Sequence, residues 1–360
     1  MPPPPPSKPY APATAIYPTI SEALHPADVI MPSFVAIDFH LPFLVDGMKA
    51  TQFYGTGLVV SINPPLIVCD RDTIPISIGD IFITFANSVI IPGRLVYLHP
   101  FYNFVVLTYD ASLLANTPVK PATFSDKPLT QGDECFLVGV GTDQSPVIKK
   151  TTVSNVGNIG TRECSPPRWR AINVEGIKVD DPVGTQGGVL CDGDGSVQAL
   201  WVNYSSQDEK SNDITFMSGL DVACVRTVTE PFMRGEYPKL RALDVEFWTM
   251  RIAAARSLGL TDEWVQRIES DSSSKHQLLY VLSLLDTSTP CSQMLKVGDI
   301  VLELEGQVAT GMRDLDRARG VDQVNIVSFV HHTPLFMNTS FAVAHGRIQS
   351  TDTVALLFSF

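Results

Sequence analysis

The most constraining feature of the sequence is a succession of short β-type runs between residue 31 and about residue 226. Each run is bounded by Gly, Pro, Asn or Asp, and no helical periodicity separates one run from the next. Many short strands at this spacing fit a pair of six-stranded barrels better than one small sandwich. The predicted strands are 34–39, 55–62, 66–70, 80–86, 94–100, 103–110, 135–141, 147–157, 168–174 and 197–204.

The pattern changes near Val228, where a small α+β module is predicted. Residues 248–260 and 261–270 are expected to be helical, with Thr261 as the N-cap of the second helix. Residues 278–285, 295–309 and 324–330 are expected to be strands, and 313–319 is helix-like.

These patterns divide the chain into four parts. Residues 1–28 are proline-rich and are expected to form a disordered or polyproline-like leader. Residues 29–228 form the double barrel, 238–333 form the small module, and the tail 334–360 has no assignable structure.

Composition excludes several function classes. The formal net charge is −12 and only 18% of residues are charged, so no basic stripe is available for nucleic acid. No apolar run reaches the ~20 residues of a membrane helix, and no secretory signal is evident. The six cysteines lack metal-ligand spacing and are expected to be reduced thiols of an intracellular protein, so no metal or cofactor is predicted.

One motif bears on chemistry. In GTQGGVL, residues 184–190, two glycines follow a polar residue, as they follow the nucleophilic serine of many serine hydrolases. Such an enzyme needs a nucleophile, a histidine base, a carboxylate, and two backbone N–H groups aimed at the oxyanion. Gln186 stands at the nucleophile position here.

Ordered motifs along the chain resemble an HtrA (Deg) type of trypsin-like protease followed by a PDZ domain. More narrowly, they resemble the degenerate second protease half of the long fungal Nma111-type proteins and of the plant Deg7 proteins. The motifs are FYGTGLVVS, LVYLHPFYNFVVLTYD, FSDKPLTQGDECFLVGVG, GTQGGVLCDGDGSVQALW, SLGLTDEWV and LKVGDIVLELEGQ. The resemblance implies a mainly β chain, a trypsin-like double six-stranded β-barrel followed by a small α+β PDZ domain.

The resemblance also places Asp72 at the family's histidine position, Asn103 at its aspartate position and Gln186 at its serine position. None of these side chains can take over the chemistry of the residue it replaces, so no intact catalytic residue is expected. Thr185 and Cys191 lie close to the lost serine, but a packing role is the favoured interpretation for both.

The resemblance implies that Gly184, Gln186, Gly187 and Gly188 form the former oxyanion loop. The N–H groups of Gly184 and Gln186 could form an anion-binding nest. The alternative, which is favoured, is that the glycines only maintain the geometry of the barrel.

In the module that resembles a PDZ domain, Leu243, Asp244, Val245 and Glu246 correspond to the carboxylate-binding loop and the strand that follows it. Asp244 replaces the usual glycine and would repel a peptide carboxylate, which leaves strand-type or internal docking open. A helix carrying Leu315 and Ala318 would flank the groove, although core packing is the simpler role for such apolar residues.

The predicted function is that of an HtrA-like pseudoprotease with a PDZ module, acting as a structural or regulatory unit that engages peptides or unfolded segments. Two alternatives stay open: an active serine endopeptidase completed by an upstream half or a partner chain, and an oligomer assembly module. Expected partners are an active protease half or sister subunits in a homo-oligomer, with neither nucleic acid nor membrane. An intracellular location is expected, cytoplasmic or nuclear, the nuclear one from the resemblance only.

Overall fold

The computed structural model describes residues 10–17, 26–48, 50–240, 243–271, 276–286, 288, 294–315, 323–330 and 342–349. Within 323–330 and 342–349 only the side chains of Ile326 and Ser328 are described. The chain divides into two compact units. The first comprises residues 1–156, 160–171 and 176–238, and the second comprises 157–159, 172–175 and 239–360.

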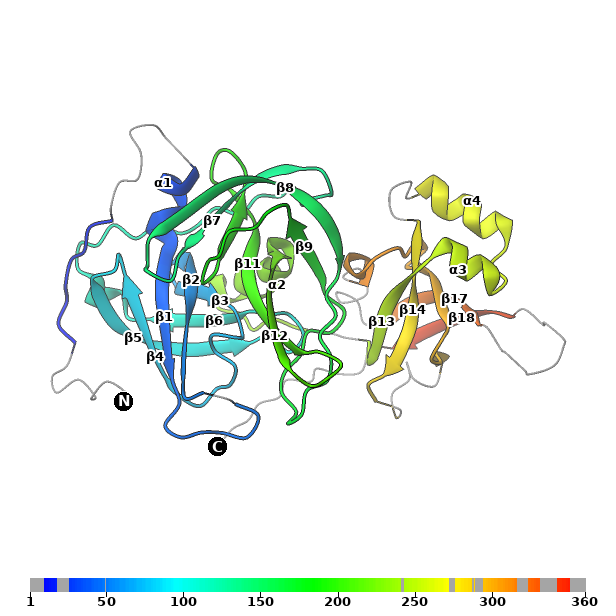
Figure 1. Ribbon diagram of the computed structural model, residues 1–360, viewed down its shortest axis with the longest axis horizontal. Coiled ribbons are helices and arrows are strands. Elements are labelled where there is room, and N and C mark those ends of the chain that lie inside the picture. Colours follow the sequence, from blue (N-terminus) through cyan, green and yellow to red (C-terminus); the bar gives the residue numbers. More distant parts are fainter. Residues whose placement is uncertain are drawn as a thin grey trace. The chain divides into compact units, whose positions relative to one another are not determined.

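The first unit contains two closed antiparallel barrels of six strands each, which confirms the predicted double barrel (Figure 1). The first barrel has the order β1-β2-β3-β6-β5-β4 and the second β10-β11-β12-β9-β8-β7. The first is built from β1 (Phe34–His40), β2 (Gln52–Ile62), β3 (Pro65–Cys69), β4 (Asp80–Phe85), β5 (Val89–Leu98) and β6 (Val105–Tyr109). The second is built from β7 (Glu134–Val140), β8 (Pro146–Asn158), β9 (Glu175–Val179), β10 (Gly188–Cys191), β11 (Val197–Gln207) and β12 (Asp213–Asp221).

Each barrel closes around its own apolar core, because alternate side chains of every strand point inward. In the first barrel Ile37, Val59, Ile67, Ile83 and Leu107 are at most 1% exposed. The corresponding residues of the second barrel include Leu137, Ile177, Leu190, Ala199 and Trp201. After β12 the chain enters helix α2 (Val222–Met233), whose first turn is capped by the carboxylate of Asp221 on the N–H of Ala223.

The predicted disordered leader is wrong for the part that the structure describes. Ala15 is buried in the core of the first barrel, and its N–H donates to Thr117 Oγ1 at 2.9 Å. Ala13 N–H donates to Leu113 O, next to the 3-10 helix η2 (Ala111–Leu114). Helix α1 (Pro26–Ile30) and the 3-10 helix η1 (Met31–Ser33) then lead into β1. A small apolar residue with satisfied backbone groups anchors this segment despite its proline content.

One predicted strand, 168–174, is also wrong. The structure begins the strand at Glu175, after Asn173, whose positive φ of 56° interrupts extended backbone. Strands β9, β10 and β12 were missed by the sequence analysis, because β9 and β10 have only five and four residues and the first half of β12 is exposed.

The second unit contains an antiparallel sheet of order β13-β14-β15-β17-β18, with β16 paired to β15. Its strands are β13 (Val245–Arg251), β14 (Gln277–Leu284), β15 (Ile300–Leu304), β16 (Gln307–Val308), β17 (Gln323–Val330) and β18 (Ala342–Gln349). Its helices are α3 (Ile252–Ser257), α4 (Asp262–Asp271) and the 3-10 helix η3 (Met312–Leu315). This is the mixed α and β content expected of a PDZ-like module.

Two boundaries in the second unit differ from the predictions. Residues 248–251 were expected to be helical, but they form the end of strand β13, which pairs with β14 along its whole length. The tail, to which no structure could be assigned, contributes β18, paired with β17. In both places pairing across the sheet overrides the local helix propensity or the weak local pattern.

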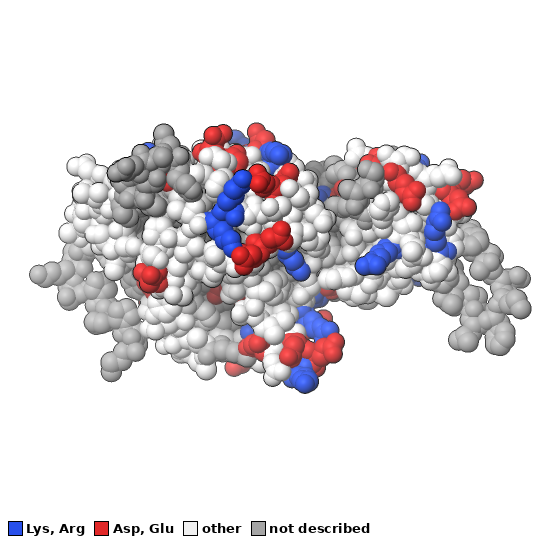
Figure 2. All heavy atoms as spheres, turned by 45° about the horizontal axis from the view of Figure 1, so that its top comes forward, with Lys and Arg blue, Asp and Glu red and all other residues white. Residues whose placement is uncertain are grey.

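Figure 2 shows one face of the molecule, on which Lys and Arg side chains are interspersed with Asp and Glu. Among the described residues, no helix is both long and apolar enough to cross a membrane.

Candidate functional site

The loop 184–187 leads directly into β10, and Gln186 stands at its centre. The backbone N–H of Gln186 donates to Val140 O at 2.8 Å, and its side-chain Oε1 accepts from Gln144 Nε2 at 3.1 Å. One of the two donors proposed for an anion nest is therefore already bonded within the protein. Gln144 was not singled out in the sequence, where nothing marks it as a neighbour of Gln186.

The glycine pair has a packing explanation that requires no catalysis. A Cβ on Gly188 would lie 2.3 Å from Val138 O, because β10 pairs closely with β7. Gly187 has a φ of 131° and faces Thr56 of the first barrel, where a Cβ would lie 3.2 Å away. Gly184 has open space around it. The requirement for glycine at 187 and 188 thus comes from backbone conformation and close strand contact.

Asp72, at the predicted histidine position, lies in the loop after β3 and faces strand β11 of the second barrel. Its Oδ2 accepts hydrogen bonds from Asn203 Nδ2 at 2.9 Å and from Ser205 Oγ at 2.7 Å. Burial raises the pKa of Asp72 to about 7, and the neighbouring carboxylate of Asp70 adds to this, whereas the Ser205 hydrogen bond and Arg168 oppose it.

Asn103, at the predicted aspartate position, is fully buried between β5 and β6. Its Oδ1 accepts from the N–H of Arg71 at 2.8 Å, and its Nδ2 donates to Asn203 O at 2.6 Å. An aspartate would keep the first bond but would have no proton for the second. The amide is therefore the side chain that satisfies both neighbours.

The structure thus brings Asp72 and Asn103 together on Asn203 but gives neither a hydrogen bond to Gln186. The partners Asn203 and Ser205 were missed by the sequence analysis. A signal existed, since Asn203 and Ser205 are two residues apart in the strand-like run VQALWVNYSS and so share one face of β11.

No described histidine lies at the predicted histidine position, which Asp72 occupies. His99 is buried, and its Nδ1 accepts from the N–H groups of Phe101 and Tyr102 at 3.1 and 2.8 Å. It orders the turn before β6, as a structural residue would. His40 Nδ1 lies 3.3 Å from the amide nitrogen of Gln52.

The two candidate substitutes for the lost nucleophile are packed away from any such base. Cys191 is buried in β10 with its Sγ 3.6 Å from Phe136 O, and burial raises the pKa of its thiol. A buried thiol with a raised pKa is a poor nucleophile. Thr185 faces Gly139, at which an added Cβ would lie 2.9 Å from the threonine Cγ2.

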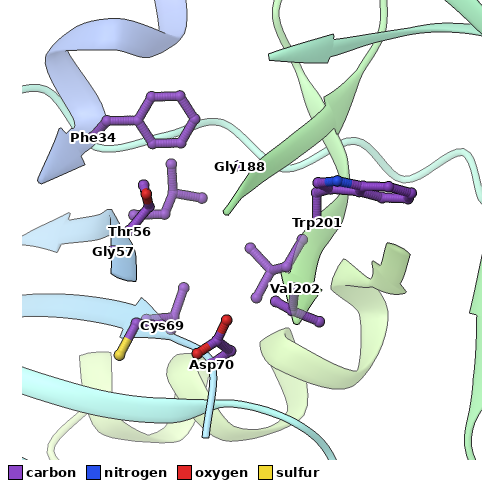
Figure 3. Close-up of a pocket in the computed structure, with 11 residues that line it drawn as sticks. Phe34, Thr56, Gly57, Cys69, Asp70, Gly188, Trp201 and Val202 are labelled. Atoms are coloured by element: carbon purple, nitrogen blue, oxygen red, sulfur yellow. The ribbon is translucent and has the colours of Figure 1, made fainter. Parts of the chain in front are cut away.

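Beneath the loop lies a small pocket between the barrels, which Figure 3 shows in close-up. Phe34 and Thr56 border it from the first barrel, and Trp201 and Val202 from the second, with the Asp70 carboxylate at one end. The full lining is Phe34, Thr56, Gly57, Leu58, Val68, Cys69, Asp70, Gly188, Leu200, Trp201 and Val202. The mostly apolar lining is that of an inter-barrel core.

In the second unit, the residues predicted for peptide binding lie at the edge strand β13. Val245 is fully buried, and Glu246 Oε2 accepts from Ser283 Oγ of β14 at 3.0 Å. Leu243 packs on the core, and burial together with Asp286 raises the pKa of Asp244.

Within the second unit, Asn173 bonds to the free edge of β13. Its Nδ2 donates to Val245 O and its Oδ1 accepts from Phe247 N, each at 2.8 Å. These are the two bonds that a residue of a parallel strand opposite Glu246 would make. Leu315 is buried in the core of this unit, and Ala318 lies outside the described residues.

Among the described residues there is no group of three or more His, Cys, Asp or Glu side chains placed to hold a metal ion.

Comparison with known proteins places this geometry in context. No protein-family model matches the chain. A PDZ domain-containing protein of Schizosaccharomyces pombe is 35% identical over 314 residues, 86% of this chain and 31% of that protein. The pro-apoptotic serine protease NMA111 of Chaetomium globosum is 33% identical over 353 residues, 96% of this chain and 34% of that protein. The corresponding protein of Neosartorya fischeri is 34% identical over 300 residues, 81% of this chain and 29% of that protein.

The chain therefore spans about a third of the length of the curated relatives it matches. Among solved structures, the HtrA-type protease AlgW with a tripeptide aligns with a TM-score of 0.54 at 15% identity, covering 90% of this chain and 94% of that one. AlgW with a decapeptide aligns with a TM-score of 0.53 at 14% identity, covering 91% and 99%. At this identity the likeness establishes the fold alone.

Proposed function

The chain is an HtrA/Nma111-type trypsin-like chain, and from this relationship we propose that it is a catalytically inactive protease module with a structural or regulatory role. It engages extended peptide segments or unfolded segments through its second unit. The serine protease activity named for its relatives then belongs to another part of such proteins or to another chain.

The observation that carries this proposal is how the three triad positions are bonded. Asp72 and Asn103 bond to strand β11, and Gln186 bonds to Gln144 and Val140. A glutamine amide is not a nucleophile. The Asp72 carboxyl, at the predicted histidine position, bonds to Asn203 and Ser205 and not to the residue at the nucleophile position. Because triad residues act as a unit, loss of all three leaves only the residual rate that binding and the oxyanion loop can supply.

Activity-based labelling tests the proposal. The purified chain is treated with a fluorophosphonate probe, with an intact trypsin-like protease as the positive control, and casein hydrolysis is measured in parallel. We expect neither labelling nor hydrolysis.

The hydroxyl of Ser205 is held by the carboxyl of Asp72, the residue at the predicted histidine position. Labelling that disappears in Ser205→Ala but persists in the matched Ser145→Ala would overturn the proposal and favour the active endopeptidase. Ser145 is a fair control because its hydroxyl bonds to the exposed carboxylate of Asp143.

For the peptide-binding role, the free edge of β13 is the expected docking surface, by strand addition. Asp244 disfavours a free C-terminal carboxylate, and Asn173 already uses the edge groups of Val245 and Phe247. We therefore expect internal, strand-type peptides to bind better than peptides that end in this groove.

Fluorescence polarisation with matched amidated and free-carboxylate peptides tests this expectation. Asn173→Ala should raise the affinity for the amidated peptide several-fold, because the edge groups of Val245 and Phe247 no longer have a partner to displace. Equal affinity in Asn173→Ala and the unaltered chain would contradict docking at this edge.

For partners, we propose an active HtrA-type protease half or sister subunits. The support is that the relatives are about three times as long as the matched region and are named as serine proteases. Light scattering after size exclusion distinguishes a homo-oligomer from a monomer that needs a second protein. A nuclear location is proposed on family resemblance, and imaging of the tagged chain tests it.

A further inference from the structure

Four hydrogen bonds join the loops of the first barrel to one short stretch of the second. Asp72 accepts from Asn203 Nδ2 and Ser205 Oγ, and Asn103 Nδ2 donates to Asn203 O. Asp70 Oδ2 accepts from the N–H of Asn203 at 3.2 Å. All the bonds end on Asn203 and Ser205 of β11, more than 90 residues away along the chain.

The two carboxyl groups in this cluster are not equivalent. Asp70 is 4% exposed and accepts from Thr73 N at 2.7 Å, from Thr73 Oγ1 at 2.6 Å and from Asn203 N. Burial raises the pKa of Asp70 as well, but its three donors favour the ionised form and oppose that effect. Asp72 has two donors and faces the charge of Asp70, so a proton on the pair is favoured at Asp72.

The surrounding charges do not neutralise both carboxylates. Arg168 acts on Asp72 through space, but its guanidinium is bonded to Asp213 at 2.9 Å. The guanidinium of Arg71 donates to the carbonyls of His99 and Pro75 instead. On the β11 side, Tyr204 is fully buried, and burial raises its pKa, so it stays neutral.

We propose that the crevice left by the former triad is a proton-linked clamp, in which one proton on Asp72 sets how tightly the first barrel is fastened to strand β11. When Asp72 carries the proton, the Asp70 carboxylate and the neutral Asp72 acid share the donors of Asn203 and Ser205. Without it, two adjacent carboxylates compete inside a partly buried crevice. The clamp does not depend on peptide binding by the second unit.

The direction of the pH dependence follows from burial. Because the pKa of Asp72 is raised to about 7 in the folded chain, folding favours the protonated form. Its stabilising contribution is complete below the pKa of the unfolded chain and is lost as the pH rises through about 7.

Thermal unfolding of the full chain at pH 5.5 and pH 8.5 tests the clamp, with Asp72→Asn as the variant that cannot ionise. We expect the Tm of the unaltered chain to fall by about 5 °C more over this range than that of Asp72→Asn. Asp143→Asn is the control, since Asp143 also accepts from a serine hydroxyl but is exposed. It should keep the pH dependence of the unaltered chain, and an unchanged pH dependence in Asp72→Asn overturns the proposal.

A carbon-13 titration of the aspartate carboxyl groups decides the question even where Asp72→Asn does not fold. One resonance should titrate at or above pH 6, and its midpoint should move upward in Ser205→Ala, because the lost hydroxyl stabilises the ionised form. A midpoint below pH 6, or no response to Ser205→Ala, rejects the clamp. Rejection of the clamp would not affect the proposal that the chain is catalytically inactive, because the labelling assay measures a different property.

Discussion

Gly188, which follows the glycine loop, and Asp70 of the polar cluster after β3 both line the pocket of Figure 3, but different interactions hold these two regions. Around Gly188 the backbone is fixed by close contact with Val138, whereas the side chain of Gln186 bonds to Gln144. Around Asp72 and Asn103 it is the side chains that carry the inter-barrel bonds. Packing thus explains the glycine of the loop region, whereas hydrogen bonds of Asp72 and Asn103 join the two barrels.

The largest expected loss of stability is at Gly188, next to the glycine loop. Gly188→Ala places a Cβ 2.3 Å from Val138 O and should lower the free energy of unfolding by about 3 kcal/mol. Gly193→Ala is the matched control, because no atom lies within 4 Å of its added Cβ. Urea unfolding of both variants tests this, and equal stability would show that strand contact does not explain the glycine.

In the polar cluster, Asn103→Ala removes both hydrogen bonds of a fully buried amide. The N–H of Arg71 and the carbonyl of Asn203 then lose their bonds to this side chain. We expect a loss of about 2 kcal/mol. Asn103→Asp should also be destabilising, since it adds a third carboxyl beside Asp70 and Asp72 and cannot donate when ionised. If both variants unfold like the unaltered chain, the polar cluster is not what joins the barrels.

At Gln186, the predicted nucleophile position, the effect on stability should be small. Gln186→Ala removes one hydrogen bond from a partly exposed side chain and should change stability by no more than about 0.5 kcal/mol. Differential scanning calorimetry beside Asn103→Ala makes the comparison direct. A larger loss for Gln186→Ala would reverse the contrast between the two regions.

No gain in hydrolysis is expected from restoring the triad with Asp72→His, Asn103→Asp and Gln186→Ser together. The N–H at position 186 would still donate to Val140 O, and the new histidine would lie among Asn203, Ser205 and Asp70. Casein hydrolysis and probe labelling of the folded triple variant measure this. Activity in that variant would mean that side-chain loss alone separates this chain from an enzyme.

Alternating apolar patterns predicted all six strands of the first barrel, but only β7, β8 and β11 of the second. The exceptions have local causes. The run 168–174 is rich in strand-forming residues, but Trp169 packs under the guanidinium of Arg71 and donates to Pro100 O, and Asn173 has a positive φ. In the second unit, residues 248–251 were predicted to be helical from the sequence. The structure has a strand there because β14 pairs with them.

The sequence by itself determined the double-barrel class, since strand periodicity is a local property, and through the family resemblance it predicted Asp72, Asn103 and Gln186 as the triad positions. Only the tertiary structure decided that Asp72 and Asn103 meet on Asn203, and that the N–H of Gln186 is already bonded. The physical reason is distance along the chain, because hydrogen-bond partners 131 and 100 residues apart are chosen by how the barrels close and not by any local pattern.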